Sequence, residues 1–234
     1  MGRRVSVTER EATIVVSVSD SADVEADAER GSKVIELDHY LPEYQVSDSN
    51  SEIVPGKPED VYARVRHLDI ARIPSVRALF WIRTLPQRVW RRSLDSRPLA
   101  RTKTITIDDI VAPGSGFKIL HETPGTGVVV GSVGKFWDPR ISHFDFDPER
   151  FRDIEEPGYG KVAWNVHVTP HGADHARVSI EVRVYMPDEK GLKWFRRYWR
   201  TVGPFSHWIR GKALRRLRKD LETGKLEDVR SRRL

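Results

Sequence analysis

Two segments in the second half of the chain alternate between apolar and polar residues. They span residues 161–169 and 177–185. A period of two places alternate side chains on opposite faces of a strand, so one face of each segment is predicted to be buried in an antiparallel sheet. Residues 170–174, with Pro170 and Gly172, supply a turn between them. The apolar positions are Val162, Trp164, Val166 and Val168 in the first segment and Val178, Ile180, Val182 and Val184 in the second.

A helical pattern follows directly. From Asp188 to about Leu221, apolar or small residues recur every three or four positions, which predicts one long amphipathic helix. Gly203 and Pro204 lie inside it, and a proline there removes a backbone donor and predicts a kink. The stripe comprises Leu192, Phe195, Trp199, Val202, Ser206, Ile209, Ala213 and Leu217.

The remaining elements are shorter. We predict a helix opened by Pro58, with acidic residues in its first turn, and a second helical stretch near residues 75–84. The order is therefore strand, helices, several antiparallel strands and one terminal helix, which is an α+β fold. Further strands are predicted at 12–18, 44–54, 117–122 and 127–137, and a short helical segment within 144–153.

Charge divides the chain unevenly. Residues 1–50 hold 11 acidic and 5 basic side chains, whereas residues 188–234 hold 15 basic and 6 acidic ones. The stretch 20–32 is acidic and lacks an apolar period, which is typical of a solvated segment. We therefore predict an acidic, poorly ordered extension at 1–41, a folded domain at 42–222 and a basic tail at 223–234.

Composition excludes several classes of protein. The chain has no cysteine, so disulfide scaffolds, thiol nucleophiles and cysteine-ligated metals are ruled out. It has no apolar run near the roughly 20 residues of a membrane-spanning helix. Its first residues lack the apolar core of a secretory signal, so we expect a cytoplasmic protein.

Two polar groups are candidate sites of chemistry. His167, His171 and His175 have the spacing of helical metal ligands, but Pro170 and Gly172 break any helix there, which favours turn histidines and no metal. Asn165, His167, Glu181 and Arg183 share one face of the predicted hairpin. A solvent-facing set of cross-strand ion pairs is favoured over an acid–base site. We therefore predict no catalytic residue and no cofactor, and we lean against an enzyme.

Four short sequence segments resemble those of a known superfamily: Phe136–Pro139, Glu156–Asn165, Glu181–Val184 and Phe195–Arg200. With the order of elements, they resemble an uncharacterised bacterial branch of the START-like (SRPBCC) superfamily. This superfamily includes birch-pollen-allergen-type proteins, lipid-transfer START domains and polyketide cyclases. The resemblance covers about residues 42–222. It implies a helix-grip fold, in which a curved antiparallel sheet wraps around a long C-terminal helix and leaves a hydrophobic cavity between them.

The resemblance implies a site for a small hydrophobic ligand, a lipid or a polyketide-like molecule, in a carrier or sensor. We place it between the sheet and the terminal helix, near the kink. Arg183 is its polar candidate, and Trp137 joins if its strand register points it inward. The predicted ligand-binding residues are Phe80, Trp137, Trp164, Val166, Val182, Arg183, Phe195, Trp199 and Val202.

Two other functions remain open. One is an enzyme of the cyclase or hydratase kind that uses polar cavity residues. The other is a basic surface module, because residues 193–219 carry ten lysines and arginines together with Trp194 and Trp208. Such a helix suits weak contact with anionic membranes or with nucleic acid phosphates. No motif of a sequence-specific nucleic acid reader is present, and the oligomeric state is left open.

Overall fold

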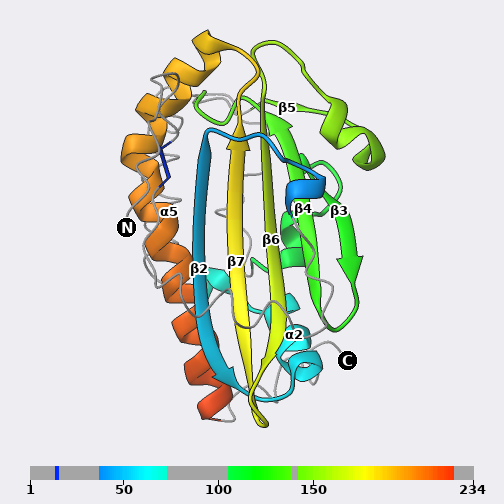
Figure 1. Ribbon diagram of the computed structural model, residues 1–234, viewed down its shortest axis with the longest axis vertical. Helices are drawn as coiled ribbons and strands as arrows, with labels where there is room; N and C mark the ends of the chain where they lie inside the picture. The colour runs from blue at the N-terminus through cyan, green and yellow to red at the C-terminus, as the bar shows by residue number, and fades with distance from the viewer. Residues whose placement is uncertain (1–13, 16–36, 73–104, 139–141, 224–234) are drawn as a thin grey trace, which may run out of the picture.

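A computed structural model of the chain shows one long, twisted sheet with helices packed on it (Figure 1). The structure describes residues 14–15, 37–72, 105–138 and 142–223. The sheet has seven strands in the order β1-β2-β7-β6-β4-β3, with β5 also paired to β4. All pairs are antiparallel except β1 with β2. This is the predicted α+β arrangement of a helix-grip fold.

The elements follow the predicted order. The strands are β1 (Ile14–Val15), β2 (Val46–Pro55), β3 (Phe117–Thr123), β4 (Gly127–Gly134), β5 (His143–Phe144), β6 (Gly160–His171) and β7 (His175–Tyr185). The helices are α2 (Pro58–Arg66), α4 (Ile107–Ile110) and α5 (Glu189–Glu222), with 3-10 helices η1 (Leu37–His39), η2 (Ile70–Arg72) and η4 (Pro148–Asp153).

The β6–β7 hairpin confirms the alternation in the sequence. Its pairing runs without interruption from Lys161 opposite Tyr185 to His171 opposite His175. Gly172 lies in the turn at φ +69°, a conformation that glycine adopts without steric cost. The apolar set of each strand therefore faces the same side of the sheet.

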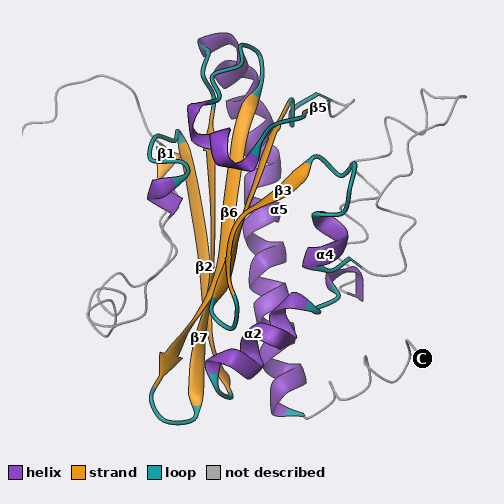
Figure 2. Cartoon of the chain, turned by 90° about the vertical axis from the view of Figure 1, so that its right-hand side faces the viewer, coloured by secondary structure: helices purple, strands orange, loops and turns teal. Residues whose placement is uncertain are grey.

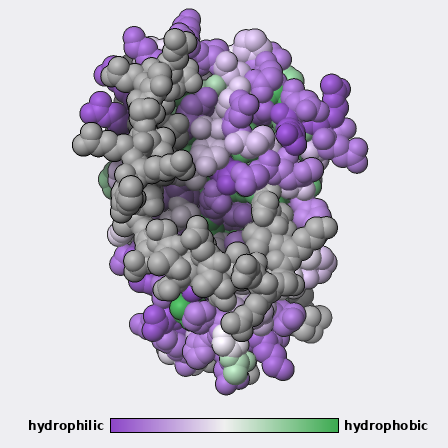
Figure 3. Space-filling view, viewed as in Figure 1, coloured by the Kyte–Doolittle hydropathy of each residue, from purple (hydrophilic) through white to green (hydrophobic). Residues whose placement is uncertain are grey.

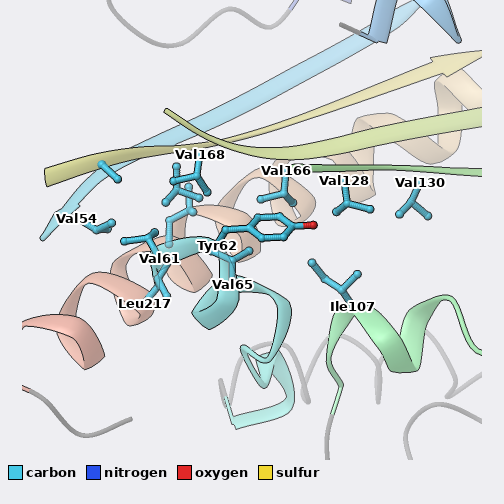
Figure 4. Packing of buried hydrophobic residues seen from close by; sticks show 13 residues of the cluster. Val54, Val61, Tyr62, Val65, Ile107, Val128, Val130, Val166, Val168 and Leu217 are labelled. Atoms are coloured by element: carbon cyan, nitrogen blue, oxygen red, sulfur yellow. The ribbon is translucent and has the colours of Figure 1, made fainter. Parts of the chain in front are cut away.

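The two faces of the sheet are covered by different elements. Helices α2, α4 and α5 lie on one face, which we call the helix face (Figure 2). There the valines of the sheet meet side chains such as Val61 and Tyr62 of α2 and Leu217 of α5 (Figure 4). The opposite face packs against η1 and η4, where Leu37 and Phe151 are fully buried. The core is thus split between the two sides of the sheet.

Helix α5 forms as the apolar stripe predicted. Asp188 caps it, and its carboxylate accepts a hydrogen bond from the backbone N–H of Gly191 at 2.6 Å. The helix continues without a break through Gly203 and Pro204, and Pro204 lies on its exposed side. No helix in the described part of the chain is both long and apolar enough to cross a membrane.

The N-terminal boundary of the domain differs from the prediction. Leu37 and Leu41, placed in the poorly ordered extension, are 1% exposed and belong to the core cluster under η1. Apolar spacing missed them because a one-turn helix has no period to detect. Helix α4, also missed, is preceded by Thr106, which forms a capping box with Asp109. The predicted helix at 75–84 lies outside the described residues.

Shortening Leu37 tests whether the domain includes η1. Leu37→Ala should lower the free energy of unfolding by about 2–5 kcal/mol, because it leaves a cavity in a closed cluster. His39→Ala on the exposed side of the same turn should change it by no more than about 0.5 kcal/mol. Urea unfolding followed by circular dichroism measures both. If both variants lower the free energy of unfolding by the same small amount, η1 does not belong to the part of the domain that unfolds cooperatively.

Candidate functional site

A buried polar network joins strand β2 to helix α5. The Asp48 carboxylate lies 2.8 Å from His207 Nδ1 and pairs with the Arg210 guanidinium. Arg210 also donates from Nε to Asn50 Oδ1 at 3.0 Å and from its terminal nitrogen to Ser206 Oγ at 2.7 Å. Asn50 lies 3.3 Å from the second ring nitrogen of His207. These five side chains, which we call the β2–α5 network, connect the middle of the helix to the middle of the strand.

Burial makes this network energetically sensitive. The Asp48 side chain is 5% exposed and that of Arg210 is 11% exposed. Burial lowers the pKa of Arg210, and the charge and hydrogen bonds of Asp48 oppose that change. The carboxylate compensates a charge that would otherwise be costly inside the protein.

The network fixes where the helix lies on the sheet. Among the strands, α5 packs chiefly along β2 (Figure 1). The apolar residues in the middle of the neighbouring strands β6 and β7 are consequently only half-buried, although they are on the helix face. We call Val162, Trp164, Ile180 and Val182 the apolar row.

Fully buried clusters close the apolar row at both ends. At one end, Phe195 of α5 packs with Val184 and Met186, and Trp199 stacks on it with ring centroids 5.6 Å apart. At the other end, the larger core cluster includes Val166, the cross-strand partner of Ile180. The row is therefore an apolar surface between two closed parts of the core.

Polar groups also lie on the two other sides of the row, one group on β2 and one on β3. In the register of the sheet, Asp48 of β2 is paired with Val182, and Val182 is paired with Trp164. On the other side of the row, Glu122 of β3 accepts a hydrogen bond from the Tyr62 hydroxyl at 2.7 Å. In the register of the sheet, the buried Val128 and Val166 lie between Glu122 and Ile180 of the row. Burial raises the pKa of Tyr62, and the hydrogen bond to Glu122 is the second cause of the increase. This phenol therefore stays protonated and remains a donor.

Arg66 stands next to this second polar group. Its guanidinium lies 2.8 Å from Asp108 and 3.6 Å from Glu122. Its remaining terminal nitrogen is buried and has no hydrogen-bond partner. A buried donor without a partner is costly, and a ligand oxygen or a water molecule would satisfy it.

The structure brings most of the predicted ligand-binding residues to this region. Trp137, Val182, Phe195 and Trp199 share one cluster, in which the Trp137 and Phe195 rings meet edge to face at 6.5 Å. Trp164 and Val166 belong to the adjoining cluster, and Val202 is half-buried on α5. Phe80 lies outside the described residues.

Arg183 requires a correction, because it lies on the opposite face of the sheet. It follows Val182 in β7, so its side chain points away from α5. There it pairs with Asp38 and Glu181, donates to the Leu41 carbonyl at 3.3 Å and stacks over Tyr44 at 4.6 Å. Arg183 therefore holds the N-terminal segment on the sheet and does not line the apolar row.

The set Asn165, His167, Glu181 and Arg183 does share one face, but it is not the solvent-facing stripe that was predicted. Asn165 is 3% exposed and Arg183 is 8% exposed. The Asn165 side chain accepts a hydrogen bond from the Glu181 backbone N–H at 3.1 Å. The prediction failed because η1, distant in sequence, contributes Asp38 and covers this end of the face.

The rest of that side of the molecule is polar. Where residues are described, its surface is largely hydrophilic (Figure 3). A half-open hollow of about 440 Å³ is lined by residues such as His39, Tyr40, Glu149 and Arg152. Within the described ranges, no group of three or more histidine or acidic side chains could hold a metal ion.

Sequence reasoning missed the β2–α5 network. Asp48 and Asn50 fall two residues apart in a strand whose inward positions begin with Val46 and end with Val54. Polar residues at inward positions interrupt an apolar alternation, and this was the available signal. Their partners on α5 are about 160 residues away, so no local pattern connects them.

Removing one member of the central ion pair tests the network. Asp48→Ala should lower the free energy of unfolding by about 3–5 kcal/mol, because the Arg210 charge is left buried and unpaired. Asp48→Ala combined with Arg210→Met should recover part of that loss. A double-mutant cycle from urea unfolding measures the coupling. If the two substitutions change the free energy of unfolding additively, the ion pair does not fix the position of the helix.

His167 gives the stability of the domain a pH dependence. Burial lowers its pKa from the ordinary 6.5, while nearby Glu181 opposes the shift, and its Nδ1 is buried without a hydrogen-bond partner. A lowered histidine pKa stabilises the fold above pH 6.5, and this contribution is lost as the pH falls through the folded-state pKa.

Chemical denaturation at pH 5 to 8 should therefore show lower stability at the acid end, by at most about 1.4 kcal/mol per pH unit for one proton. His167→Gln should weaken that dependence. Burial also lowers the pKa of His143, so part of the dependence should remain in the variant. An unchanged slope in His167→Gln would contradict the assignment.

The chain was compared with known proteins. No protein-family model matches the sequence, and no curated protein sequence is significantly similar to it. Among solved structures, it is similar to a protein from Deinococcus radiodurans (13% identity, TM-score 0.33, 76% of this chain and 98% of that one). A hypothetical protein from Helicobacter pylori is similar at 13% identity and TM-score 0.37, over 78% and 92% of the two chains. The di-domain ARO/CYC BexL from the BE-7585A biosynthetic pathway is similar at 13% identity and TM-score 0.29, over 76% of this chain and 46% of that one. Similarities at this level say nothing about a shared ligand or reaction.

Proposed function

We propose that this domain binds a small hydrophobic molecule, such as a lipid or a polyketide-like compound, against the apolar row. The observation that carries the proposal is the half-burial of Val162, Trp164, Ile180 and Val182 in the middle of the helix face. Fully buried clusters lie on both sides of these residues. A protein gains no stability from apolar surface left in contact with water, so a surface of this kind in the middle of a core supports a binding role.

The energy for binding comes from covering this surface. Each 100 Å² of apolar area removed from water contributes about 2.5 kcal/mol before the cost of association. Trp164 and Trp199 offer large flat surfaces at little entropic cost. Affinity should therefore rise with the apolar area of the ligand.

The polar borders favour binding over catalysis. Asp48 and Arg210 are engaged with each other, and Tyr62 is engaged with Glu122. A general acid or base must present an available proton or lone pair to the substrate. The buried donor of Arg66 suits an uncharged oxygen at one end of the ligand, because two carboxylates already balance its charge. Among the described residues around the apolar row, no free acid or base supports the cyclase or hydratase alternative.

Two variants test the proposal with an uncharged fluorescent probe, N-phenyl-1-naphthylamine. Trp164→Ala should weaken probe binding about tenfold, because it removes on the order of 60 Å² of contact. Val182→Phe should also weaken binding, because the larger side chain would occupy the position proposed for the ligand while removing no apolar area. The matched control is Trp194→Ala, a tryptophan that is 55% exposed on α5, and it should leave the affinity unchanged.

Thermal unfolding of each variant separates lost binding from lost folding. If folded Trp164→Ala and Val182→Phe bind the probe as tightly as the original protein, the apolar row is not the site. If the original protein binds no apolar probe, the domain does not have this function.

A further inference from the structure

Helix α5 carries a second aromatic surface that faces away from the sheet. Trp194, Phe205 and Trp208 are 55%, 50% and 42% exposed. At 3.6 residues per turn these positions fall within an arc of about 60°. Trp194 and Trp208 are about 21 Å apart along the axis at 1.5 Å per residue. The three rings therefore form one outward stripe along the helix.

The same face is strongly basic. Over all its faces, helix α5 contains 11 lysines and arginines against 3 acidic residues, and of the basic residues Arg210 is buried against the sheet. Two of those acids, Asp220 and Glu222, are paired with Arg216 and Arg218. Lys212 lies over the Trp208 ring at 5.6 Å. Other exposed basic side chains within or beside the aromatic arc are Lys190, Arg197, Arg215 and Lys219.

We infer that this outer face of α5 docks on the surface of an anionic lipid bilayer. Indole and phenyl rings insert at the boundary between headgroups and acyl chains, and arginine and lysine attract the anionic headgroups beside them. Duplex nucleic acid offers the same negative charge but no apolar layer to receive three exposed rings. The combination of rings and charge in one arc therefore favours a bilayer.

The docking face is independent of the apolar row. Phe195 and Trp199 point from the same helix into the core, while the aromatic stripe points outward. A molecule bound against the apolar row would thus lie on the inner side of the helix that contacts the membrane. The inference holds whether or not the apolar row binds a ligand.

Co-sedimentation of the full chain with vesicles tests the inference. The protein should bind vesicles made of equal parts phosphatidylcholine and phosphatidylserine, and bind phosphatidylcholine alone much more weakly. Trp194→Ala with Trp208→Ala should lower the affinity about tenfold or more, because two rings no longer insert. Arg197→Gln with Arg215→Gln should also lower the affinity for vesicles about tenfold, because it removes two positive charges that attract the anionic headgroups. Raised salt should weaken binding of the original protein.

Trp164→Ala is the matched control, because it alters a tryptophan on the sheet and leaves the outer face intact. It should keep vesicle binding even if it loses the hydrophobic probe. The inference is overturned if the double tryptophan variant, shown to be folded by circular dichroism, binds vesicles as well as the original protein. It is also overturned if the chain binds duplex DNA with a steep salt dependence and does not bind the anionic vesicles.

Discussion

The buried ion pair between Asp48 and Arg210 determines how helix α5 sits on the sheet. Apolar packing alone lets a helix slide and rotate, because dispersion and burial have little direction. A charged pair with 5% and 11% exposure has one geometry that compensates both charges. Asn50, Ser206 and His207 complete its hydrogen bonds. It holds the helix along β2 and leaves part of β6 and β7 half-covered.

This placement explains why one helix has two different working faces. Its inner stripe supplies Phe195 and Leu217 to the clusters at the two ends of the apolar row. Its outer stripe exposes two tryptophans and a phenylalanine among basic residues. On the inner side, Gly203 leaves room for the Trp199 ring, because a Cβ at position 203 would lie 2.8 Å from that ring. The helix therefore connects the proposed ligand surface with the proposed membrane surface.

The other face of the sheet has a structural role. Arg183 anchors the segment around η1 through Asp38, the Leu41 carbonyl and Tyr44. Gly131 of β4 allows Phe151 of η4 to approach closely, since a Cβ there would lie 2.9 Å from that ring. Lys161, 4% exposed, donates to the Arg152 carbonyl and pairs with Glu155. Polar side chains on this face therefore hold the covering segments against the sheet.

The sequence by itself determined the elements whose causes are local. The alternation at 161–169 and 177–185, the 3-and-4 spacing after Asp188 and the turn at Gly172 each depend on neighbours within a few residues, and the structure contains all of them. Only the tertiary structure decided which polar residues are buried and what covers them. Asp48 meets Arg210, and Arg183 meets Asp38, across separations of 162 and 145 residues. Pairing over such distances depends on how the elements pack in three dimensions, and no periodicity in one segment contains that information.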